Sequence, residues 1–255
     1  MRFLRNVFIV LLVLAVVAGA LAWTAPADLA YRLFGARLAP LTAQGLGGSV
    51  WDGTAERVAA FDFPLGRAAW HIDRGAAIRG TLAGDIDLRG QQVHGTARFV
   101  RVAGALDVQA LKAEFPAQLL APALDIPALV LLGTVALDVE RLEFADGVLR
   151  TARGKATWRD LGVTGSAEAR LPGLEITFAP DASGQIVADI HDLGGPLAIA
   201  GRTTIAGTQY RSETHLWLRE PNPQLEEALK WIGERSPSPE GGSLLRIEGQ
   251  IQPLQ

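Results

Sequence analysis

The sequence of 255 residues contains no cysteine, one methionine and two tyrosines. The lack of cysteine excludes disulfides, thiolate metal sites and cysteine nucleophiles. No cluster of basic residues follows Arg5 and the formal net charge is −3, so the chain has no electrostatic footprint for nucleic acid. Apolar residues make up 49% of the chain and charged residues 20%. This composition favours a chain that folds and that crosses a membrane once at most.

The one long apolar run lies near the N-terminus. Residues 7–23 contain no charged or amide side chain, and Arg2 and Arg5 precede them. With its flanks, a helix rising ~1.5 Å per residue reaches the ~30 Å thickness of the hydrocarbon layer. The positive-inside rule then leaves the N-terminus in the cytoplasm, and Trp23 lies where an interfacial aromatic is expected.

We therefore predict a transmembrane signal-anchor over residues 1–25 of a bacterial inner-membrane protein, followed by a periplasmic domain over residues 26–255. The alternative is a cleaved signal peptide, because Ala18-Gly19-Ala20 resembles a cleavage site. The length of the apolar run favours retention of the anchor, because signal-peptide cores are shorter.

Beyond Pro26, short segments of alternating polarity are separated by Gly, Pro and Asp, which predicts a mainly β, antiparallel domain. The clearest segments are residues 82–89, 135–144, 186–191 and 245–251. In the second, Leu142 and Phe144 change phase relative to Val135 and Val139, which indicates a β-bulge near Glu140.

Two segments break this alternation and predict short helices. The first opens at Pro116 and runs to residue 120; the second covers residues 222–232, with Pro223 in its first turn and Gly233 after its end. Residues 121–127 are the best boundary between two possible halves of the domain.

Each predicted strand has one apolar and one polar face. A sheet of this kind must curl around its own core or bind something along the apolar face, because a flat one would leave that face in water.

Candidate catalytic chemistry is sparse. His71 and Asp73 have the spacing of two ligands of a metal site, with His191 or His215 as a third. A solvated strand face explains the same pair without a metal, because alternate residues share a face. We find no buried carboxylate pair and no nucleophile elbow, so we predict no enzyme, no catalytic residue, no metal and no cofactor.

A series of glycines and tryptophans remains. It begins with Trp51 and Gly53 in the block Gly48-Ser49-Val50-Trp51-Asp52-Gly53-Thr54-Ala55. Further positions are Trp70, Gly80, Gly133 and Trp158. In order and spacing, and behind an N-terminal anchor, this series resembles the N protein of the type II secretion system. Tryptophan and glycine in strands also have packing explanations, so these six residues are interpreted as structural.

The resemblance implies a non-catalytic inner-membrane protein of the assembly that exports folded periplasmic proteins through an outer-membrane secretin. Its expected partners are other secretion subunits of the inner-membrane platform, the secretin, or both. The domain is also similar to the curved, groove-forming or half-barrel sheets of AsmA-like proteins, which implies an alternative function of binding lipid or acyl chains. Trp51, Trp70 and Trp158 would plug the concave side in the first case and rim an open trough in the second.

Overall fold

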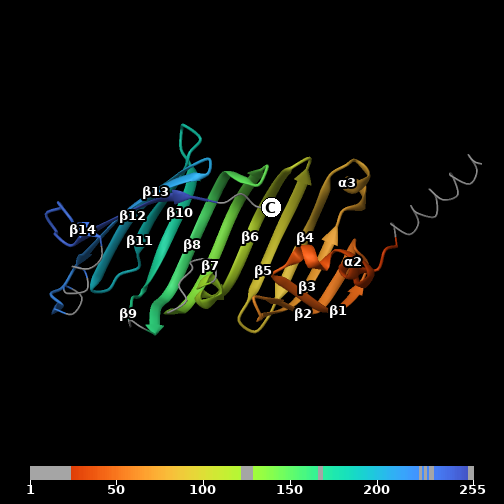
Figure 1. Cartoon of the computed structure of the whole chain (residues 1–255), viewed down its shortest axis with the longest axis horizontal. Helices are drawn as coiled ribbons and strands as arrows, with labels where there is room; N and C mark the ends of the chain where they lie inside the picture. The colour runs from red at the N-terminus through yellow and green to blue at the C-terminus, as the bar shows by residue number, and fades with distance from the viewer. Residues whose placement is uncertain are drawn as a thin grey trace, which may run out of the picture.

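The computed structural model describes residues 24–121, 129–165, 169–223, 226, 229 and 233–251 (Figure 1). The predicted anchor therefore lies almost wholly outside the described residues, and so does most of the predicted boundary at 121–127. Within the described ranges, no helix is both long enough and apolar enough to cross a membrane.

The described residues form one sheet of fifteen strands. Neighbouring strands pair in antiparallel fashion, and their order in the sheet follows the order of the chain almost throughout. The exceptions are β9, which pairs only with β8, and β14, which lies outside β15. The strands are β1 (Leu41–Gly48), β2 (Asp52–Ala60), β3 (Phe63–Ile72), β4 (Leu82–Arg89), β5 (His94–Val102), β6 (Ala105–Pro116), β7 (Leu129–Ala145), β8 (Val148–Gly165), β9 (Ala169–Arg170), β10 (Gly173–Pro180), β11 (Ile186–Asp192), β12 (Leu197–Ala206), β13 (Gln209–Leu218), β14 (Glu234–Arg235) and β15 (Ser243–Gln250).

This arrangement confirms the predicted β class and the four alternating segments. The predicted bulge is also present, because the register of β7 against β8 shifts between Val139 and Arg141. The shift returns Leu142 and Phe144 to the face that carries Val135. Strand β6 pairs with β7 along nearly its whole length, so the sheet continues across the two predicted halves.

The short helices are α2 (Ala27–Phe34), η1 (Gly35–Leu38), α3 (Arg74–Ile78) and η2 (Ala117–Leu120). The predicted helix after Pro116 is confirmed as the 3-10 helix η2. In the second predicted helix, Pro223, Glu226 and Leu229 are helical, while the positions between them and from 230 to 232 lie outside the described residues. The alternating pattern gave no sign of α2 and α3.

The core is thin for a chain of this size. Most of its buried apolar residues are alanine, valine or leucine, and no large side chain among the described residues is completely buried. One cluster lies where η2 packs against β7, with Ala117, Leu131 and Val135 at its centre. The other joins Leu229 to Leu197 and Ile199 of β12. The helical segments therefore cover the sheet locally.

Candidate functional site

The register divides the side chains of the sheet into two faces, because residues paired across antiparallel strands project from the same side. One face, here called the apolar face, is continuous from β2 to β15. Its members include Ala55, Ala68, Trp70, Ile86, Ala97, Val108, Phe115, Val135, Leu142, Trp158, Leu174, Ile176, Ile190, Ile199, Leu216, Leu245 and Ile247. A single sheet thus carries an apolar surface across its whole width.

The opposite, polar face carries ion pairs between neighbouring strands. Examples are Asp85 with Arg98 at 2.9 Å, Asp189 with Arg202 at 2.7 Å, and Arg211 with Glu248 at 2.7 Å between nitrogen and oxygen. These side chains are mostly exposed, and such pairs contribute at most about 1 kcal/mol each. The polar face is therefore built to lie in water.

The apolar face is only partly covered. Ile86 is 43% exposed, Leu82 40% and Ile247 44%. The cluster under η2 covers the row that contains Val135 and Trp158. At the other end of the same strands, the row of Leu106, Phe144 and Leu149 is half-buried.

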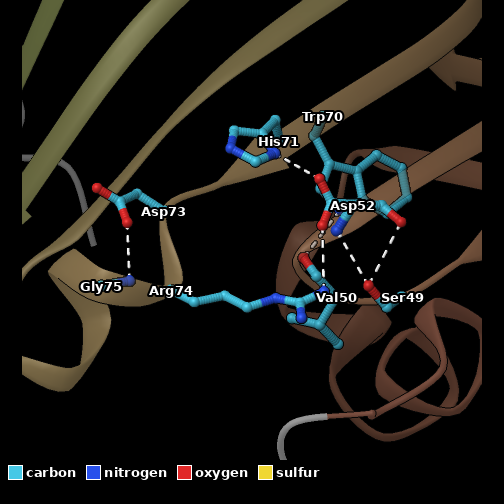
Figure 2. A network of polar contacts seen from close by, with 8 residues as sticks. All are labelled: Ser49, Val50, Asp52, Trp70, His71, Asp73, Arg74 and Gly75. Carbon is cyan, nitrogen blue, oxygen red and sulfur yellow. Dashed lines mark hydrogen bonds and ion pairs between the residues drawn. The ribbon is translucent and has the colours of Figure 1, made fainter.

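A polar network joins β2, β3 and α3 at the N-terminal end of the sheet (Figure 2). The Asp52 carboxylate contacts His71 Nδ1 through one oxygen and Arg74 Nη2 at 3.2 Å through the other. The hydrogen bond from His71 and the charge of Arg74 lower the pKa of Asp52. Since Asp52 and His71 are both more than half exposed, water screens the contact. The network holds the start of β2, at Asp52, against the end of β3 and the start of α3.

Contacts of the Trp70 ring explain why tryptophan stands at position 70 and glycine at position 53 of the motif. Its indole Nε1 donates a hydrogen bond to the Val50 carbonyl at 2.9 Å, and its ring lies over Gly53, its partner across β2 and β3. A Cβ built on Gly53 would lie 2.2 Å from ring atom Cζ2. Only glycine fits under the ring as it stands. Trp51 belongs to the same turn, and its carbonyl accepts from the Ile72 amide at 2.6 Å.

Trp158 repeats this arrangement in the middle of the sheet. Its Nε1 donates to the Leu132 carbonyl at 2.8 Å, and the ring packs against the cluster formed by η2 and β7. Gly133 follows with φ of +95°, and a Cβ there would lie 2.3 Å from the Arg159 carbonyl oxygen. Both motif residues are therefore tied to one irregularity in the pairing of β7 with β8.

A buried carboxylate fixes the C-terminal part of the sheet. The Asp192 side chain is 7% exposed and pairs with Arg219, with Oδ1 and Nη1 2.8 Å apart. It also accepts from the backbone amides of Ile199 and Gly194, each at 2.8 Å. Burial opposes the charge, but Arg219 and the two amides outweigh it and lower the pKa of Asp192 to about 2. This pair ties the β11–β12 turn to the end of β13.

The candidate metal ligands are not brought together. β3 ends at Ile72, and the Asp73 carboxylate accepts from the Gly75 amide at 2.7 Å at the start of α3. The expectation that His71 and Asp73 share a strand face was therefore wrong, because Asp73 caps a helix. His191 and His215 lie on β11 and β13, far along the strand order. Across the described ranges, no three metal-binding side chains cluster.

A model of the type II secretion system protein N family matches residues 39–242, which is most of the chain. The chain belongs to this family. The predicted resemblance is thereby confirmed. Searches of curated proteins and of solved structures gave no match.

Membership of the protein N family assigns the chain to type II secretion, indicates a membrane-associated location in that system, and implies other secretion subunits as partners. The family is a structural component of the secretion system and is not known as an enzyme.

Of the three motif glycines, Gly80 is the one where an added Cβ would meet open space. Its φ of +80° after α3 is the conformation that favours glycine there.

Sequence reasoning missed the pair of Asp192 and Arg219, because 27 residues and two strand pairings separate them. A local signal for α2 was present. Asp28 and Arg32 are four residues apart and pair at 3.0 Å, and Pro26 precedes the helix as Pro116 precedes η2.

Proposed function

We propose that the protein is a non-catalytic subunit of the type II secretion system. It is anchored in the inner membrane by residues 1–25 with the N-terminus in the cytoplasm, and it contacts other secretion subunits in the periplasm through the free edge of its sheet. The observation that supports this most is the open outer edge of β15. Among the described residues, only β14 pairs with that edge, at Ser243 and Leu244.

The hydrogen-bonding groups of β15 can be assigned to its two sides. The Ile251 amide donates to Thr208 on the β13 side at 2.7 Å, and the Gly242 carbonyl accepts from Ser236 on the outer side at 2.9 Å. Since backbone groups alternate along a strand, the amides and carbonyls of Arg246, Glu248 and Gln250 point outward.

A strand of a partner can satisfy these outward groups by extending the sheet. Strand addition takes its affinity from main-chain hydrogen bonds and its specificity from alternate side chains. Here the alternate side chains differ in kind, with Ile247 on the apolar face and Glu248 on the polar face. The edge therefore fits an extended segment of another secretion subunit that alternates in the same way.

Glu248→Pro tests this proposal, with Glu248→Ala as its matched control. Both variants lose the carboxylate that pairs with Arg211, but only proline loses the outward amide, and an edge strand tolerates it. We expect Glu248→Pro to lower secretion of a type II substrate about tenfold or more, which corresponds to loss of about 1.4 kcal/mol in partner binding. We expect Glu248→Ala to secrete normally.

Both variants must accumulate to the wild-type level and unfold at the same temperature. Equal secretion by the proline variant and the wild type would exclude docking at this edge. Equal loss in both variants would assign the effect to the carboxylate instead.

A second candidate function is the binding of lipid or acyl chains along the apolar face. It is favoured by the partial exposure of that face, since Leu82 and Ile86 are 40% and 43% exposed and lie on one strand. Apolar surface of this extent in water is typical of a binding site.

Mass spectrometry of organic extracts from the purified full-length protein tests this second function. We expect stoichiometric lipid in the wild type and less in Ile86→Asn, with Asp85→Asn on the polar face as control. A lipid-free wild-type extract would rule against the second function and leave the first intact.

A further inference from the structure

Helix α2 carries exposed leucines on the side away from the sheet. Leu29 is 51% exposed and Leu33 68%, and the two are one helical turn apart. Phe34 and Leu41, at 54% and 43%, extend the exposed apolar surface to the start of β1. Four of the large exposed apolar residues thus fall within one segment of thirteen residues.

The orientation of α2 is fixed by contacts on its other side. Ala27 is 4% exposed, and the Tyr31 hydroxyl accepts from the Ala43 amide of β1 at 2.9 Å. Just before the helix, the Ala25 carbonyl accepts from the Val50 amide at 3.0 Å. The helix cannot turn its leucines toward the sheet without breaking these bonds. They are therefore held outward.

The position of α2 in the chain indicates what covers these leucines. The apolar run ends at residue 23, and α2 begins at Ala27. At no more than ~3.6 Å per residue, the connecting residues span at most about 15 Å. Headgroups add roughly 5–8 Å on each side of the hydrocarbon layer, so this length keeps α2 within reach of that layer. Arg32 and Asp28, the two charged residues of the helix, are both exposed and pair with each other at 3.0 Å, so α2 carries no net charge beside its leucines.

We propose that α2 lies in the membrane interface, with Leu29 and Leu33 inserted among the lipids, and that it sets the angle at which the sheet leaves the membrane. The inference rests on the proposed anchor at residues 1–25. An amphipathic helix tied to the sheet by Tyr31 adds a second point of attachment. Two attachments restrict the rotation of the sheet relative to the bilayer, so the free β15 edge, at the other end of the strand order, keeps a defined height (Figure 1).

The absence of cysteine allows a direct test with single nitroxide labels on the full-length chain. Leu33→Cys is the probe, and Val102→Cys, a 45% exposed apolar residue at the end of β5, is the matched control. The protein is placed in vesicles of phosphatidylethanolamine and phosphatidylglycerol, and the collision of each label with oxygen and with a water-soluble nickel chelate is measured. We expect the label at residue 33 to favour oxygen at least threefold more than the label at residue 102.

Equal access of the nickel chelate to both labels, in protein that resists extraction by alkaline carbonate, would overturn the inference and leave the anchor intact. Extraction of the protein by carbonate would instead overturn the anchor itself. Dipolar broadening at residue 33 that disappears on dilution with unlabelled protein would assign the leucines to a contact with a second copy, and would also overturn the inference.

Discussion

Trp70 and Trp158 lie on the same face and donate the same kind of hydrogen bond, but their surroundings differ. Earlier in the chain than each tryptophan lies a short helix that begins after a proline in extended conformation. Helix α2 begins after Pro26 and η2 after Pro116, with φ of −64° and −63°. Near Trp158, η2 lies on the apolar face and the sheet beneath it is buried. Near Trp70, Ile86 of the neighbouring strand is 43% exposed.

The two regions differ in whether the helix covers the apolar face. In the middle of the sheet, the helix closes over the tryptophan and contributes a completely buried residue, Ala117. At the N-terminal end, α2 packs against β1 and turns its leucines outward, and the apolar face beside Trp70 is mixed, with Ala68 buried and Ile86 exposed. The middle of the apolar face is therefore covered by a helix, whereas part of the face at the N-terminal end stays exposed.

Replacing each tryptophan by alanine tests this comparison with the largest expected effect. We expect Trp158→Ala to lower the free energy of unfolding by about 3 kcal/mol and Trp70→Ala by about half as much. Both rings are partly buried, but among the described residues only Trp158 of the two packs against a cluster of buried residues, so its loss leaves the larger cavity. Urea unfolding of the full-length protein in detergent, followed by circular dichroism, gives both values. Equal losses would show that η2 adds nothing.

The glycines sharpen the same comparison. Gly133→Ala combines a φ of +95° with a clash against backbone, and should cost about 3 kcal/mol. Gly80→Ala has a φ of +80° but open space around the new methyl group, and should cost about 1 kcal/mol. Thermal unfolding of the two variants measures the difference. A Gly80 variant as unstable as the Gly133 variant would contradict the role assigned to the β7–β8 irregularity.

The C-terminal part of the sheet is fixed by a titratable group, the Asp192 carboxylate, rather than by a tryptophan. The pKa of Asp192 falls from 3.8 to about 2 on folding, which corresponds to about 2 kcal/mol of stability above pH 4. Because the folded-state pKa is lowered, this contribution is complete above pH 4 and is lost as the pH falls toward 2. Asp192→Asn should be less stable than the wild type by about that amount at pH 7, and the gap should narrow between pH 4 and pH 2.

Urea unfolding at a series of pH values checks this prediction. A gap that stays constant down to pH 2 would show that the charge of Asp192 does not stabilise the fold.

The exposed pairs of the polar face should show the smallest effect. Asp85→Asn breaks the contact with Arg98, and both side chains are more than half exposed. We expect a loss below about 0.5 kcal/mol at physiological salt, since water screens such pairs. Urea unfolding of this variant beside Asp192→Asn separates the exposed pair from the buried one, and a comparable loss in both would refute that separation.

Much of the sheet could be predicted from the sequence, because alternation directly records which side chains face water. It located Ile86 and Ile190 on the apolar face, and the phase change after Val139 revealed the bulge. The helices were harder. In α2, the outward leucines follow no alternating pattern. Helix α3 depends on the Asp73 cap, but the two-residue spacing of His71 and Asp73 also fits a strand.

The candidate sites depend on contacts between strands, which no local pattern records. The motif singled out Gly53 and Trp70 as separate positions, but only the register shows that the ring lies over the glycine. The same holds for Asp192 and Arg219, which meet through the pairing of β11, β12 and β13. The open part of the β15 edge likewise follows from the strand pairing, because among the described residues β14 pairs only with Ser243 and Leu244.

In-cell photo-crosslinking from β15 tests the central claim most directly. A photoreactive residue replaces Arg246 on the edge in one strain and Arg98, on the polar face of β5, in another. The account predicts adducts between the residue at position 246 and other type II secretion subunits, abolished by Glu248→Pro and kept in Glu248→Ala. Adducts to secretion subunits only from position 98, or adducts to lipid alone from position 246, would contradict docking at the edge.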